Sequence, residues 1–163
     1  MNKIFVLLLI SFASFAQLKK GTFTAGSKVL ELDRDGKTGT DKFVFSPSVG
    51  FIVAKNLEYG FSFNISHQSG TDFNGSYSDE QTSITNYIVK YFGKAKFQPF
   101  VTAGIDFLNS NSDGVSAMVG LGGHYFVSPT VAIGGQYKIY DIGRNVRSRN
   151  FGVNFTFFIP RKK

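Results

Sequence analysis

The alternation of apolar and small polar residues over positions 43–67 constrains the fold more than any other feature of the chain. Every second residue is apolar on both sides of a short turn at residues 54–56. Successive side chains of a β-strand point to opposite faces, so a period of two predicts a hairpin of two strands, 42–54 and 57–68. One face of this hairpin consists of these residues: Phe43, Phe45, Pro47, Val49, Phe51, Val53, Leu57, Tyr59, Phe61, Phe63 and Ile65.

The opposite face of the hairpin is made mostly of Gly, Ser and Asn. The water-facing side of a soluble sheet usually carries Lys, Glu and Thr, whereas small residues suit the crowded interior of a narrow closed barrel. We therefore interpret the apolar face as the lipid-facing surface of a transmembrane barrel. A soluble β-domain that buries the same apolar face is the alternative.

The same alternation predicts an all-β fold of eight antiparallel strands in up-and-down order. The predicted strands are 22–32, 42–54, 57–68, 82–92, 97–108, 115–126, 131–140 and 149–159. Short turns alternate with longer loops, as in outer-membrane barrels that have periplasmic turns and extracellular loops. An even number of strands lets the first pair with the last, and this closure matters because lipid offers no partners to an open strand edge.

Three local expectations follow from the pattern. Pro47 has no N–H group, so we expect a bulge or a missing ladder hydrogen bond there. In the strand 82–92 we expect Lys90 to face the interior and three residues to face lipid: Tyr87, Val89 and Tyr91. Four aromatic residues near the short turns are expected to form a girdle at the membrane surface: Tyr59, Tyr91, Tyr125 and Phe126.

Residues 1–16 have the three parts of a secretory signal peptide. Lys3 supplies the positive region, residues 4–12 the apolar region and residues 14–16 the small-residue cleavage site. The apolar run is too short for a membrane-spanning helix, and the chain has no Cys for lipid attachment. We therefore expect export and cleavage, with residues 17–163 forming one barrel domain in the bacterial outer membrane.

The formal net charge of +7 indicates an anionic partner. Nucleic acid is excluded as that partner, because the chain is predicted to be exported and its basic residues lie in loops rather than along a stripe. Membrane lipids and lipopolysaccharide carry the expected counter-charge. We expect Arg144, Arg147 and Arg149 to cluster at the loop end of the barrel and to contact lipopolysaccharide phosphates.

Five ionisable residues are expected to form a charge network in the lumen: Glu58, Lys90, Asp106, His124 and Lys138. An eight-stranded barrel leaves room only for its own side chains, which favours a static network over a pore or a proton relay. Glu58 would lie diagonal to Lys90 on the neighbouring strand and pair with it, with His124 as a third member.

The two histidines also raise the alternative of a lipid-modifying enzyme. His67 could face Ser69 or Asp72, but nothing in their spacing requires a nucleophile, a base and an orienting acid to meet. No cluster of His, Asp and Glu has metal-ligand spacing. We therefore predict no catalytic, cofactor or metal site.

Two segments resemble the small eight-stranded outer-membrane barrels of the OmpX and OmpA type, and the widespread outer membrane protein β-barrel or porin-like family. The first is the Tyr91-Phe92 strand end followed by a short turn into residues 97–104. The second is the last strand, with its polar residue, glycine and two alternating aromatics: Asn150, Gly152, Phe155 and Phe157. The resemblance implies recognition of the last strand by the barrel-assembly machinery. Family members often stop at a terminal aromatic residue, whereas residues 160–163 follow here.

The sequence thus predicts a non-enzymatic, monomeric outer-membrane barrel with a side-chain-filled lumen. Its role would be structural, adhesive or otherwise one of surface interaction, through loops that include 69–81 and 141–148. Two alternatives stay open. The resemblance also allows an enzyme that modifies lipid A by acyl transfer or deacylation, and a soluble periplasmic barrel could bind a small ligand.

Overall fold

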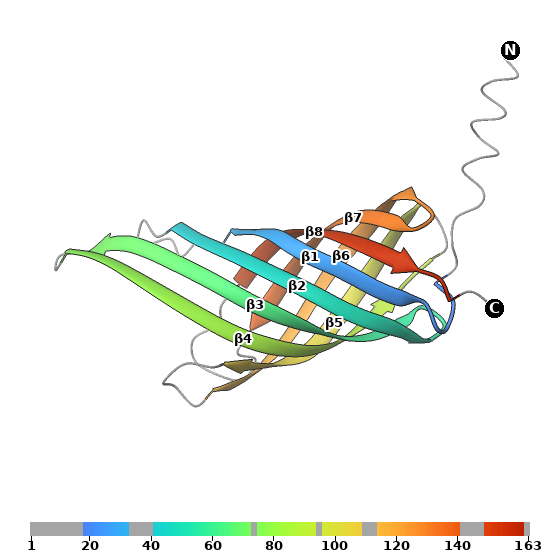
Figure 1. The fold of residues 1–163 in the computed structure, drawn as a ribbon, viewed down its shortest axis with the longest axis horizontal. Coiled ribbons are helices and arrows are strands. Elements are labelled where there is room, and N and C mark those ends of the chain that lie inside the picture. Colours follow the sequence, from blue (N-terminus) through green and yellow to red (C-terminus); the bar gives the residue numbers. More distant parts are fainter. Residues whose placement is uncertain are drawn as a thin grey trace, which may run out of the picture.

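Eight antiparallel strands form a closed barrel in the computed structural model, which describes residues 18–32, 41–72, 75–93, 96–108, 114–140 and 149–161. Each strand pairs with its neighbours in the chain, and β1 pairs with β8 to complete the ring (Figure 1). The predicted up-and-down barrel is therefore confirmed. The strands are β1 (Phe23–Leu32), β2 (Asp41–Ala54), β3 (Leu57–Asp72), β4 (Gly75–Tyr91), β5 (Phe97–Leu108), β6 (Val115–Ser128), β7 (Val131–Tyr140) and β8 (Arg149–Ile159).

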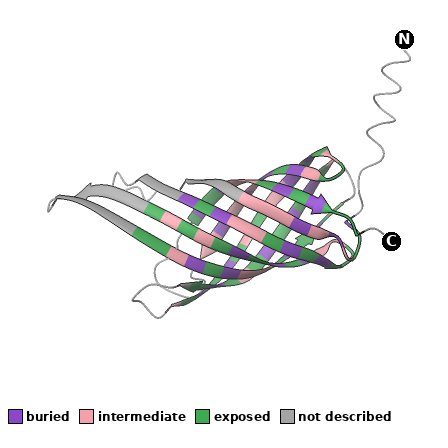
Figure 2. Cartoon of the chain, in the orientation of Figure 1, coloured by how far each residue is buried: buried purple, intermediate pink, exposed green. Residues whose placement is uncertain are grey.

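Large apolar side chains cover the outside of this barrel, and small or polar ones point inward. On β3, for example, Phe61 is 44% exposed whereas its neighbour Ser62 is 6% exposed. Buried and exposed residues alternate along the strands over the middle of the barrel (Figure 2). A surface of this kind is far larger than the apolar patches of soluble monomers, so it is suited to lipid rather than to water.

The orientation predicted for β4 is wrong, whereas β2, β3 and β5 to β8 face as expected. Val89 and Tyr91 are buried inside the barrel, and Ile88 and Lys90 are exposed on its outer face. Both faces of this strand carry apolar residues, so the alternation alone does not identify the inner one. Pairing with β3 decides the matter, because Val89 lies directly opposite the inward-facing Glu58.

The predicted loop 69–81 is also wrong, because most of it is β-structure. β3 and β4 are 16 and 17 residues long, and their pairing continues to Asp72 opposite Gly75. The hairpin extends beyond the other strands at the end of the barrel opposite the chain termini (Figure 1). Its Ser, Gly and Asp content is typical of loops, but backbone pairing that is already in register can continue through such residues.

Short turns lie at the other end of the barrel. The turn between β2 and β3 contains Asn56 with a φ of 56°, a left-handed conformation that Asn adopts more readily than most residues. Within β2, the pairs with β3 are missing at Ser46 and Pro47 and resume in the same register at Ser48. Pro47 therefore interrupts the ladder without a bulge, one of the two outcomes expected for it.

Candidate functional site

The barrel interior is the part of the molecule where polar and ionisable side chains converge, and it encloses a cavity of about 60 Å³. Glu58, His124 and Lys138 line this cavity together with several hydroxyl and amide side chains. One water molecule needs roughly 10–15 Å³ of such a volume, so the cavity has room for a few waters.

Glu58 accepts hydrogen bonds from three side chains and is only 3% exposed. Its Oε1 accepts hydrogen bonds from the Thr24 hydroxyl at 2.7 Å and from the Tyr87 hydroxyl at 3.1 Å. Its Oε2 accepts a hydrogen bond from the Tyr91 hydroxyl at 2.5 Å. Three hydroxyl donors from β1 and β4 therefore stabilise the carboxylate on β3, since hydrogen bonds to an ionised acceptor are stronger than those between neutral groups.

A glycine makes space for one of these donors. A Cβ atom on Gly60 would stand 2.6 Å from the Tyr87 hydroxyl oxygen and 2.6 Å from the Val49 carbonyl oxygen. Because the carbonyl is part of the β2 backbone, it could not move aside cheaply. Gly60 is thus needed for the Tyr87 ring to cross over β3 and reach Glu58.

Lys90 is not part of the interior, and the predicted pairing with Glu58 is wrong. Its side chain is exposed on the outer face, and its Nζ donates a hydrogen bond to the Lys55 carbonyl oxygen at 3.1 Å. The predicted diagonal pair requires Glu58 to lie opposite Phe92, two residues after Lys90, but the structure places Glu58 opposite Val89. This shift by three residues reverses the face of every β4 side chain.

Asp106 and Lys138 lie inside the barrel, as predicted for both. Asp106 accepts a hydrogen bond from the Thr85 hydroxyl at 2.9 Å. Thr85 in turn accepts one from the Asn64 amide at 2.8 Å, so a polar chain crosses β3, β4 and β5. Lys138 is buried on β7 and contributes to the cavity wall.

His124 is also buried, but among aromatic rings rather than beside a carboxylate. Its ring centroid lies 4.9 Å from that of Phe100, 5.7 Å from that of Tyr91 and 5.9 Å from that of Phe158. Its Nε2 is 3.5 Å from the Thr156 hydroxyl, and its Nδ1 has no hydrogen-bond partner among the described residues. This arrangement packs the imidazole as part of the filled lumen.

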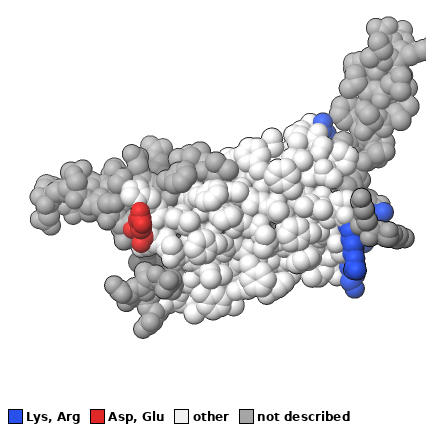
Figure 3. All heavy atoms as spheres, viewed as in Figure 1, with Lys and Arg blue, Asp and Glu red and all other residues white. Residues whose placement is uncertain are grey.

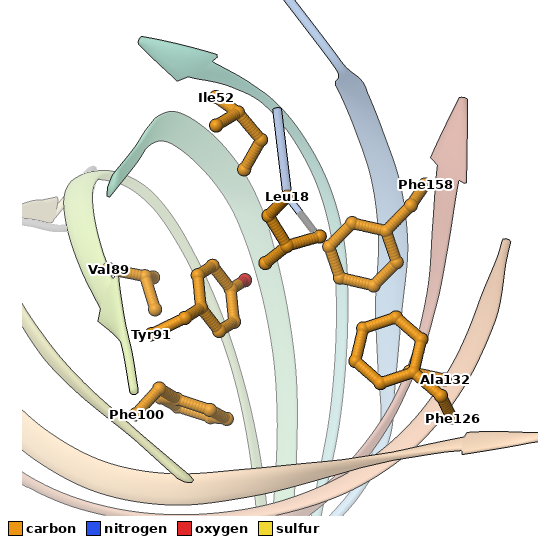
Figure 4. Packing of buried hydrophobic residues seen from close by; sticks show 8 residues of the cluster. All are labelled: Leu18, Ile52, Val89, Tyr91, Phe100, Phe126, Ala132 and Phe158. Carbon is orange, nitrogen blue, oxygen red and sulfur yellow. The ribbon is translucent and has the colours of Figure 1, made fainter. Parts of the chain in front are cut away.

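An apolar plug closes the lumen at the short-turn end. Figure 4 shows its members converging inside the barrel: Leu18, Ile52, Val89, Tyr91, Phe100, Phe126, Ala132 and Phe158. Tyr91 and Phe126 therefore do not belong to the predicted outer girdle, whereas Tyr59 and Tyr125 are exposed as expected. The inward position of Tyr91 follows from the corrected orientation of β4.

Leu18 is a member of the plug that lies outside all the predicted strands. It precedes β1 and is only 2% exposed. The Asn56 amide donates to the Leu18 carbonyl oxygen at 3.4 Å, and the Gly21 amide donates to the Ile52 carbonyl oxygen at 2.8 Å. These bonds hold the segment across the barrel opening. A single apolar residue before two lysines gave no periodic signal by which to predict this contact.

The remaining candidates lie on the outer surface or outside the described residues. His67 forms an ion-pair contact with Glu80, directly opposite on β4, with 3.6 Å between Nδ1 and Oε1. The side chains of Ser69 and Asp72 are outside the part of the structure that is described, as are Arg144 and Arg147 as a whole. Arg149 is exposed at the first position of β8.

Neither a metal centre nor a membrane helix is found in the described ranges. They contain no group of three or more His, Cys, Asp or Glu residues that could hold a metal ion. Across the same residues, no helix has the length and apolar character needed to cross a bilayer.

Comparisons with known proteins agree with this architecture. The family model described as "Outer membrane protein beta-barrel domain" matches residues 4–157. The N-terminal β-barrel domain of Pseudomonas aeruginosa OprF is 14% identical with a TM-score of 0.62, over 86% of this chain and 98% of that one. Neisserial surface protein A is 18% identical with a TM-score of 0.52, over 83% and 94%.

A structure from the de novo design of transmembrane β-barrels is similar as well, with a TM-score of 0.54 and 14% identity over 88% of this chain and all of that one. No curated protein sequence matches the chain. At these identities the structural likeness shows the fold alone.

Proposed function

The chain belongs to the outer membrane protein beta-barrel domain family, and from this premise we propose that it is a non-enzymatic barrel with a structural or adhesive role at the cell surface. The closed, plugged lumen is the observation that carries the proposal. Among the described residues, the interior contains a cavity of about 60 Å³, and eight apolar or aromatic residues pack together at the short-turn end. This argues against transport through the barrel and in favour of contacts with other molecules at its ends.

The β3–β4 hairpin supports a role in surface contact. β5 pairs with β4 only from Ser83 onward, so residues 75–80 of β4 have β3 as their one partner among the described strands. A strand edge with unpaired N–H and C=O groups can accept a strand of another molecule. We infer that this hairpin is extracellular, because the short turns at the opposite end are typical of the periplasmic side.

The surroundings of both histidines support a non-catalytic role. His124 is packed among three aromatic rings in the lumen, and His67 contacts an acidic residue on the exposed hairpin. We also propose that Arg144, Arg147 and Arg149 contact lipopolysaccharide phosphates, since Arg149 is exposed at the same end as the hairpin. This contact would anchor the barrel rather than modify the lipid.

Surface labelling tests the proposed orientation and role. An epitope inserted between Asn74 and Gly75 is expected to be labelled on intact cells, whereas one between Lys55 and Asn56 should need a permeabilised outer membrane. Cells that display the protein should lose adhesion to a host-cell layer when residues 71–76 are replaced by a two-residue turn. Labelling of only the second site on intact cells would reverse the orientation, and unchanged adhesion would exclude the hairpin as the contact surface.

A further inference from the structure

Basic side chains gather at the short-turn end of the barrel, around the plug. Figure 3 shows them at this end of the molecule, away from the acidic side chains of the β3–β4 hairpin. We define the basic rim by its exposed or half-exposed cations: Lys19, Lys20, Lys55, Lys90, Lys96 and Arg161. They come from the segment before β1, from two turns, from the end of β4 and from the residues after β8.

The described residues of the short turns and of the two terminal segments at this end include no Asp or Glu. Glu58, the second residue of β3, is buried and bonded to three hydroxyl groups. Glu80 contacts His67 on the hairpin near the other end of the barrel. The rim therefore presents an excess of positive charge to whatever surrounds this end.

Two of the cations show where the positive charge lies relative to the membrane surface. Lys90 is on the outer face of β4, and its Nζ turns toward the rim to reach the Lys55 carbonyl oxygen. The Lys96 ammonium is 4.7 Å from the centroid of the Tyr125 ring, and Tyr125 is 47% exposed on the outer face of β6. Exposed aromatic rings and lysines that direct their charge away from an apolar surface both mark the level of lipid head groups.

We propose that the basic rim binds the phosphates of anionic phospholipids in the adjoining leaflet. The proposal rests on the proposed function, because it requires the apolar belt to lie in a bilayer. A soluble polyanion would need cations on the end surface of the barrel, but Lys90 and Lys96 lie beside the lipid-facing side chains of Val101 and Tyr125. Each basic residue near an anionic surface contributes on the order of fivefold in affinity, so the rim as a whole selects these lipids strongly.

Native mass spectrometry of the folded barrel in a neutral detergent tests this selection. Phosphatidylglycerol and phosphatidylcholine are titrated separately, and the retained lipids are counted. The wild type is expected to retain phosphatidylglycerol at least about tenfold better, and less so as salt rises. The K55Q/K90Q/K96Q variant should lose this preference, whereas the charge-retaining K55R/K90R/K96R variant should keep it.

A second variant shows whether a lost preference is due to misfolding of the first. K19Q/K20Q alters residues that precede β1 and leaves the barrel wall intact, and it should reduce the preference about threefold or more. Equal retention of both lipids by the wild type, or an unchanged preference in both variants, would overturn the lipid site. If the two variants lost binding to soluble peptidoglycan fragments but retained lipids like the wild type, the rim would be a cell-wall contact, and the lipid site would again be overturned.

Membrane insertion is measured in parallel, from the shift of the unboiled band on a gel. A wild-type chain that fails to insert into vesicles would contradict the proposed function. Insertion without lipid preference would contradict only the lipid site.

Discussion

Glu58 is a buried carboxylate that draws its partners from hydroxyl groups instead of a cation. Thr24 on β1 and Tyr87 and Tyr91 on β4 all donate to it. These bonds tie strands that are not all neighbours, and they lie next to the apolar plug. Removing the carboxylate leaves two buried donors, the hydroxyls of Thr24 and Tyr91, without their acceptor, which is more costly than the loss of an exposed contact.

We expect Glu58→Ala to lower the free energy of unfolding by about 2–4 kcal/mol, since unsatisfied buried polar groups cost about 1–3 kcal/mol each and partly rearrange. Urea-induced unfolding from lipid vesicles measures this change. Glu58→Gln should cost less, because its amide oxygen still accepts hydrogen bonds. A Glu58→Ala variant as stable as the wild type would show that the hydroxyl cluster does not contribute.

A double-mutant cycle identifies the partner. Glu58→Ala and Tyr91→Phe should be non-additive by about 0.5–3 kcal/mol, because they share one hydrogen bond. Glu58→Ala and Lys90→Ala should be additive, because Lys90 is on the outer face. Coupling to Lys90 instead of Tyr91 would restore the ion pair expected from the sequence.

At the scale of the elements, the alternation of residues correctly orients most strands but not β4. Strands with one apolar face, such as β2 and β3, could be oriented correctly from the sequence. The same pattern correctly placed Glu58, Asp106, His124 and Lys138 inside the barrel. β4 is apolar on both faces, so its orientation depends on its register with β3, which the polar residues near Asp72 and Gly75 conceal. Lys90 was misplaced for this reason. The buried position of Leu18 could not be predicted, because a single apolar residue outside a strand forms no alternating pattern.

The orientation of β4 can be tested with two substitutions on its outer face. Ile88→Arg should destabilise the inserted barrel by about 1–3 kcal/mol, because it places a charge in lipid between the midplane and the interface. Lys90→Leu is the matched control and should leave the barrel as stable as the wild type. The folded fraction on an unboiled gel gives the comparison. Greater loss with Lys90→Leu than with Ile88→Arg would support the opposite orientation.

The segment before β1 acts as a separate element that closes the lumen. Leu18→Ala should lower the free energy of unfolding by about 2–4 kcal/mol, the usual cost of truncating a buried leucine. Lys19→Ala is the matched control, since its side chain is exposed, and should change stability by less than about 0.5 kcal/mol. Equal effects of the two substitutions, measured by urea unfolding, would mean that Leu18 does not pack in the barrel opening.

The whole molecule combines an apolar outer belt with an interior that its own side chains fill. Both follow from the same alternation, because small inward residues let the eight strands close around Glu58, His124 and the plug. The apolar plug lies at one end of the lumen, and the proposed interactions involve the two ends of the barrel: the extended β3–β4 hairpin and the basic rim.

Current recording across a planar lipid bilayer tests the closed lumen most directly. Purified barrel is reconstituted after its folded state is verified by the band shift, and current is recorded at low and moderate voltage. The plugged interior predicts no steady conductance above that of the bare bilayer. A stable open channel in the wild-type protein would contradict the closed lumen.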